Sequence, residues 1–138
     1  MAYMIPYYIA DQGQPSPVLR YIWDEDPVSH FQHDPSELLE KIENTTIRAK
    51  IALCIGIYEW IIWRYHRLTN DVTPFQIAEA AWCSNIHDIY IEYYELDPKE
   101  YLGPVLDPLY MSMMWMGTVL FNTAENKDEW EIPNHMCS

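Results

Sequence analysis

Two sets of carboxylates in this sequence have a spacing that metal-dependent hydrolysis uses. Residues 37–40 read ELLE and residues 92–95 read EYYE, so each stretch places two glutamates three residues apart. On a helix, side chains three or four residues apart lie on one face, which also brings Asp88 beside Glu92. Carboxylates on two facing helices are a ligand set that could hold Mg²⁺ for the hydrolysis of a phosphate compound.

The ELLE and EYYE pairs resemble the ExxE pairs of the helical nucleotide pyrophosphohydrolases of the MazG type. The resemblance implies an all-helical enzyme that uses Mg²⁺ to hydrolyse a nucleotide. The two pairs lie far apart in the sequence, and no cluster of Lys or Arg stands near them to hold phosphates. We therefore keep a Mg²⁺-dependent nucleotide phosphohydrolase as an alternative, and expect neither an enzyme nor a bound cofactor.

A second group of ligand-type residues lies in HFQHD, which places His30, His33 and Asp34 close together. Imidazole and carboxylate bind zinc and other transition metals. An HxxH pair in a loop lacks the fixed geometry of a helical HExxH motif, and no third ligand is evident. We interpret Asp34 as a helix cap beside two surface histidines. No GxSxG motif, Cys–His signature or glycine-rich phosphate loop occurs in the sequence.

The net charge of −13, with only eight Lys and Arg, limits the classes of partner. It would repel phosphate backbones and anionic membranes, so we expect neither a nucleic acid nor a membrane as partner. A basic protein would be attracted and steered. Acidity would also keep in solution a chain that contains six Trp and eleven Tyr.

The length of 138 residues favours a single domain, and the pattern of residues 35–124 predicts an all-α bundle of about four helices. We expect these helices at about 35–43, 47–68, 74–95 and 108–123. Residues 1–34 hold four of the ten prolines and predict an extended, aromatic arm or a short hairpin. Residues 125–138 form a polar tail.

Capping signals predict where three of the helices begin. Asp34-Pro35, Thr73-Pro74 and Asp107-Pro108 each place a capping side chain before a proline. Helix 47–68 is apolar most of the way round, which predicts a central helix buried by several neighbours. Glu59 within it is expected to form an ion pair in the core.

The helices at 74–95 and 108–123 differ in their expected surfaces. On the first, Ile86 is expected to face the core, whereas Ser84, Asp88, Glu92 and Glu95 form an exposed acidic face. The second is apolar on every side, so we expect most of it in the core and part of it in a homodimer contact. Its uncharged run of seventeen residues is short for a membrane span, opens with Pro108 and lacks flanking basic residues.

Cysteine usage and the N-terminus favour a cytoplasmic protein. The three cysteines, at positions 54, 83 and 137, are odd in number and widely spaced, which predicts reduced thiols. The first residues contain neither a basic region nor a clear apolar region of a signal peptide.

The profile as a whole predicts an acidic binding protein that neutralises a basic partner by occlusion, as immunity proteins and antitoxins do. Charge would speed the encounter, and aromatic anchors would hold the complex. A nucleic-acid-mimicking phage inhibitor is a further alternative. The expected partner-binding residues form a main acidic and aromatic set and a second acidic patch: Asp88, Glu92, Tyr94, Glu95 and Glu100 in the first, and Asp24, Glu25 and Asp26 in the second.

Overall fold

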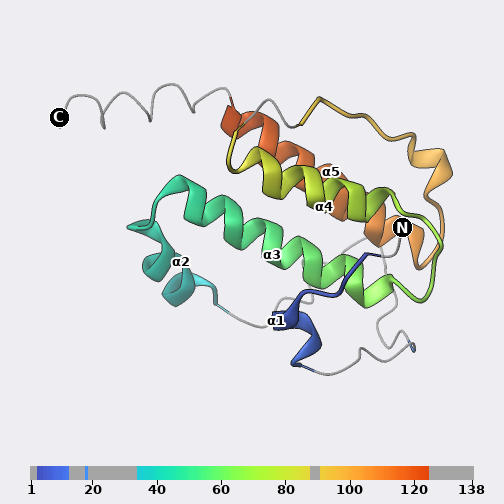
Figure 1. Cartoon of the computed structure of the whole chain (residues 1–138), viewed down its shortest axis with the longest axis horizontal. Coiled ribbons are helices and arrows are strands. Elements are labelled where there is room, and N and C mark those ends of the chain that lie inside the picture. The colour runs from blue at the N-terminus through green and yellow to red at the C-terminus, as the bar shows by residue number, and fades with distance from the viewer. Residues whose placement is uncertain (1–2, 13–17, 19–33, 88–90, 125–138) are drawn as a thin grey trace.

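The secondary structure is helical, as the sequence predicts. A computed structural model describes residues 3–12, 18, 34–87 and 91–124 (Figure 1). Within these ranges there are five α-helices and one short 3-10 helix: α1 (Tyr7–Ala10), α2 (Ser36–Glu43), α3 (Ile47–Tyr65), α4 (Thr73–Ser84), η3 (Pro98–Glu100) and α5 (Leu106–Ala124). The predicted all-α, bundle-like fold is confirmed.

The core lies between α3, α4 and α5, which pack against one another. Figure 1 shows α4 and α5 side by side and running in the same direction, with α3 running the opposite way. The most deeply buried apolar side chains come from all three helices: Ile51, Ile55, Tyr58 and Ile62 from α3, Ala78 and Ala81 from α4, and Leu109, Met113, Met116 and Leu120 from α5. Because α3 contacts both neighbours, it buries a broad surface, as predicted for the central helix.

The connection between α4 and α5 differs from the prediction of a helix over 74–95, which is wrong beyond Ser84. Residues 91–97, here called the crossover segment, are extended and return along the bundle (Figure 1). Parallel neighbours need such a return. The twelve residues of α4 rise about 18 Å at ~1.5 Å per residue. Seven extended residues span about 23 Å, so the crossover segment is long enough to return along the whole of α4. A continued helix would have carried the chain away from the start of α5.

The end of α4 is fixed by a side chain of α3. Arg48 Nη1 donates to the backbone oxygens of Asn85 (3.1 Å) and Ile86 (3.2 Å), and Asn85 Nδ2 donates to the backbone oxygen of Arg48 (3.2 Å). A cation placed here satisfies carbonyls that have no partner inside the helix and complements its dipole. The prediction that Ser84 is exposed and Ile86 faces the core is therefore wrong, because Ser84 is buried and Ile86 is 71% exposed.

The predicted caps are partly right. Pro35 holds the N-cap position of α2, and Asp34 just before it accepts from the backbone N–H of Ser36 (3.0 Å) and so satisfies the first donor of the helix. Hydrogen bonds from the hydroxyl and the N–H of Ser36 lower the pKa of Asp34. Thr73 is not a cap, since its own N–H donates to Asp71 Oδ1 (3.0 Å). The central helix ends at Tyr65 rather than residue 68, and α5 begins two residues before Pro108.

The described part of the N-terminal arm is helical at 7–10, so the hairpin alternative is wrong there. Ile9 of α1 enters the core with 2% of its surface exposed, and Tyr3 stacks on Phe75 of α4 with ring centroids 5.2 Å apart. By contrast, α2 buries none of its residues. The acidic patch at 24–26, His30 and His33, and the tail at 125–138 lie outside the described residues.

The last helix, α5, has both buried and exposed apolar side chains. Met113 and Met116 are fully buried, whereas Met111 and Trp115 are 49% and 44% exposed. Among the helices that the structure describes, none combines the length and the apolar character that crossing a bilayer requires.

Candidate functional site

The crossover segment presents its side chains alternately, as an extended chain does. Tyr94 and Leu96 are half-buried, whereas Tyr93, Glu95 and Asp97 are exposed. Tyr93 Oη donates to Glu95 Oε1 (2.9 Å), a contact between two side chains on the same side of the segment. This hydrogen bond and the charge of Glu95 raise the pKa of Tyr93.

Tyr94 fastens the segment to α5. Its hydroxyl donates to the backbone oxygen of Met113 (2.6 Å), and its ring meets Phe121 edge-on with centroids 5.6 Å apart. The hydroxyl also lies against Gly117, where an added Cβ would come within 3.0 Å of it. Burial raises the pKa of Tyr94. The residue that we predicted as a partner contact is therefore first of all a structural anchor.

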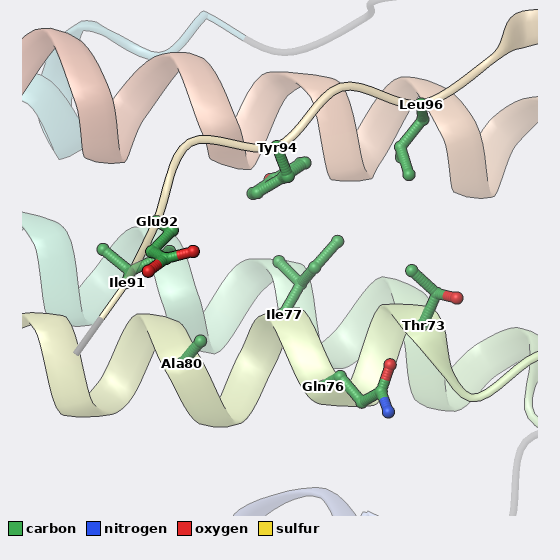
Figure 2. A pocket seen from close by; sticks show the side chains of 8 residues that line it. All are labelled: Thr73, Gln76, Ile77, Ala80, Ile91, Glu92, Tyr94 and Leu96. Carbon is green, nitrogen blue, oxygen red and sulfur yellow. The ribbon is translucent and has the colours of Figure 1, made fainter.

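A pocket of about 210 Å³ separates the crossover segment from α4 (Figure 2). It is lined by two rows of residues: Thr73, Gln76, Ile77 and Ala80 from one face of α4, and Ile91, Glu92, Tyr94 and Leu96 from the segment. In Figure 2 the side chains of Ile77 and Leu96 extend toward each other's element. A cavity of ~150 Å³ can hold benzene, so this pocket has room for one aromatic or branched side chain.

One carboxylate lines the pocket, and others follow it along the chain. Glu92 belongs to the lining, and Glu95, Asp97 and Glu100 are exposed on the residues that follow. Lys99 is the basic side chain in this stretch. The structure places Glu92, Tyr94 and Glu95 on the extended crossover segment and Glu100 on η3, rather than on a helix face, and only Glu92 and Tyr94 of these line the pocket. Asp88 lies outside the described residues.

The metal-site alternative depends on two helical ExxE pairs. ELLE lies on α2, but EYYE lies in the crossover segment and is not helical. Over the described ranges, no group of three or more His, Cys, Asp or Glu side chains comes together in a way that could hold a metal ion. The helical geometry inferred from the resemblance at EYYE is therefore wrong.

Glu59 is a buried carboxylate that is held by neutral groups. Only 7% of its surface is exposed, Trp82 Nε1 donates to its Oε1 (2.7 Å), and the Tyr8 hydroxyl donates to its Oε2. The ion pair predicted in the core is wrong for the contacts that the structure describes. Burial raises the pKa of Glu59, and the hydrogen bond from Trp82 partly offsets this effect.

Glu59→Gln should stabilise the protein at neutral pH and leave its stability nearly unchanged in acid. A folded-state pKa above the unfolded value means that the folded state binds the proton more tightly, so wild-type stability falls as pH rises between the two values. Glutamine can accept from Trp82 and donate to the Tyr8 hydroxyl without a charge. Urea unfolding of both proteins at several pH values measures the difference, and a difference that is constant with pH would contradict this account.

The sequence reasoning missed the α4 side of the pocket. Thr73, Gln76, Ile77 and Ala80 have the helical spacing i, i+3, i+4, i+7, which is visible in the sequence. That spacing identifies a common face but does not say whether the face meets the core or a pocket. Gly117 was also missed, because its closeness to Tyr94 depends on how the segment crosses α5.

The chain has no match among protein-family models, curated proteins or solved structures.

Proposed function

We propose that this protein binds a basic protein partner through the crossover segment, η3 and the pocket, and neutralises that partner by covering its active or binding surface. Immunity proteins and antitoxins act in this way. The net charge of −13 would steer such a partner toward the protein and speed association.

One observation carries the proposal: an exposed carboxylate, Glu92, lines a small, mainly apolar pocket, and further exposed carboxylates follow it along the chain. Stable interfaces combine an apolar centre with a polar rim, and a few anchors that fill pockets supply most of the binding energy. Here Ile77, Ile91 and Leu96 supply the apolar lining. Glu92 supplies charge at the pocket and Glu95 supplies it three residues further along the segment, where the Lys or Arg of a partner can pair while a neighbouring apolar side chain enters the pocket.

A homodimer through residues 108–123 stays a prediction alongside this proposal. Met111 and Trp115 are the large apolar side chains of α5 that remain about half exposed. They lie on the helix to which Tyr94 fastens the crossover segment, but each is two residues from the buried Met113 and so points away from the side that Tyr94 contacts. A dimer contact there would leave the proposed partner surface free.

Reversing the charges at the site should slow association at low salt by at least about tenfold, because electrostatic steering contributes 10- to 10³-fold to association rates. The variant is Glu92→Lys, Glu95→Lys, Glu100→Lys. The partner is the basic protein that the wild type captures from a lysate of the source cells and that mass spectrometry identifies. Surface plasmon resonance with the purified pair then gives the association rates, and an assay of the partner's own activity tests neutralisation.

A matched control lies on α2. Glu37→Lys, Glu40→Lys, Glu43→Lys changes the net charge by the same amount on exposed positions of another surface. This control should associate much faster than the site variant. If the two variants slow association equally, total charge rather than this site guides the partner. If the site variant associates as fast as the wild type, or the partner keeps its full activity in the complex, the proposal fails.

A further inference from the structure

The backbone of the crossover segment is unpaired. In the part of the chain that the structure describes, no hydrogen bond engages the backbone N–H or C=O groups of residues 91–96. The side chain of Tyr94 hydrogen-bonds the segment to α5, and Asp97, which caps η3, accepts from the backbone N–H of Lys99. An extended chain with free donors and acceptors is a template for pairing with another strand.

The segment is also held in place. A fixed segment favours binding, because no free energy is then spent on ordering it when a partner strand pairs with it. Tyr94 fixes its middle to α5 through Met113 and Phe121. Beyond η3, Tyr101 is 8% exposed and packs near Tyr110 of α5, with ring centroids 5.8 Å apart. Anchors at the middle of the segment and beyond its C-terminal end hold the free backbone against the bundle.

The pocket lies along the same residues. Ile91, Glu92, Tyr94 and Leu96 line it from the segment, so a chain laid beside the segment would run past the pocket. Side chains of an added strand alternate in direction. One of them can therefore enter the pocket toward Ile77 while its neighbours point outward, where Glu95 and Asp97 are exposed.

Charge argues against a second copy of this chain as the added strand. Antiparallel pairing of two crossover segments would bring Glu92, Glu95 and Asp97 of one copy near the same acids of the other. Like charges on facing strands destabilise the pair. A strand that alternates basic and apolar residues can pair its basic side chains with the carboxylates and place an apolar side chain in the pocket.

We propose that the partner binds by strand addition: an extended basic–apolar segment pairs with the backbone of residues 91–96 and places one apolar side chain in the pocket between the crossover segment and α4. This inference rests on the proposed function, because it assigns a binding mode to that same surface. Main-chain hydrogen bonds would supply affinity, and the pocket and acids would supply specificity.

Synthetic peptides test the binding mode without altering the protein. The probe is an acetylated octapeptide of alternating lysine and valine. Two derivatives carry N-methyl groups on either all lysine or all valine nitrogens, because successive N–H groups of a strand point to opposite edges. A fourth peptide has the same composition with valines at helical spacing. Isothermal titration calorimetry gives affinities, and amide NMR spectra locate the contact.

The parent peptide should bind and protect amides within 91–96 from hydrogen exchange. One N-methylated peptide should bind at least tenfold more weakly than the parent, and the other should bind nearly as well. Equal effects of the two methylations, or tighter binding of the helical peptide, would overturn strand addition while leaving the surface as a binding site. If none of the basic peptides binds, both this inference and the proposed surface fail.

Discussion

Tyr94→Ala should release the crossover segment from α5 and lower the free energy of unfolding by about 3 kcal/mol. The side chain is half-buried, donates a hydrogen bond to the Met113 carbonyl and meets Phe121. Truncating a buried aromatic side chain costs about 3–5 kcal/mol, and partial exposure places this site at the lower end. Urea unfolding measures the stability, and the basic protein partner or the lysine–valine octapeptide reports the loss of binding.

The neighbouring tyrosine is a matched control for this prediction. Tyr93 also meets Phe121, with ring centroids 5.2 Å apart, but it is 69% exposed and its hydroxyl bonds to Glu95 rather than to α5. Tyr93→Ala therefore removes the Phe121 contact without removing a buried anchor and should cost about 1 kcal/mol or less. Tyr94→Phe should lose only the hydrogen bond, which is worth about 1 kcal/mol. Equal costs for Tyr93→Ala and Tyr94→Ala would mean that Tyr94 does not anchor the segment.

Tyr58→Ala should lower the free energy of unfolding by about 4 kcal/mol, a large share of the ~5–15 kcal/mol typical of a folded domain. Tyr58 of α3 is completely buried in the core. Its hydroxyl donates to the backbone oxygen of Pro74 (2.7 Å), which ties α3 to the first turn of α4. Urea unfolding should show a lower midpoint with an unchanged slope if the folded state survives.

A larger aromatic residue on the same helix provides the comparison. Trp60 lies two residues further on and is 45% exposed, so Trp60→Ala should cost much less than Tyr58→Ala despite removing more atoms. If Trp60→Ala destabilised the protein as much as Tyr58→Ala, the exposed side of α3 would have to be covered in solution.

Local signals in the sequence determined the helical class and most helix starts. Proline after a polar residue marked the beginnings near Ser36 and Thr73, although Thr73 itself is not a cap, and an almost continuous apolar surface marked α3 as the central helix. These features depend on residues within one or two turns of one another, so they can be recognised without knowing the fold. The acidic, aromatic character of residues 91–101 was likewise visible, and it pointed to the surface on which the proposed function rests.

Only the tertiary structure decided how that surface is built. The helical pattern of 74–95 continues past Ser84, but Arg48 of α3 binds the carbonyls at Asn85 and Ile86, and Tyr94 fits against Gly117 of α5. Both contacts join residues more than twenty positions apart. Helix propensity differs by only ~0.7 kcal/mol or less among ordinary residues, so packing and long-range hydrogen bonds can override it and leave the acids on an extended segment beside a pocket.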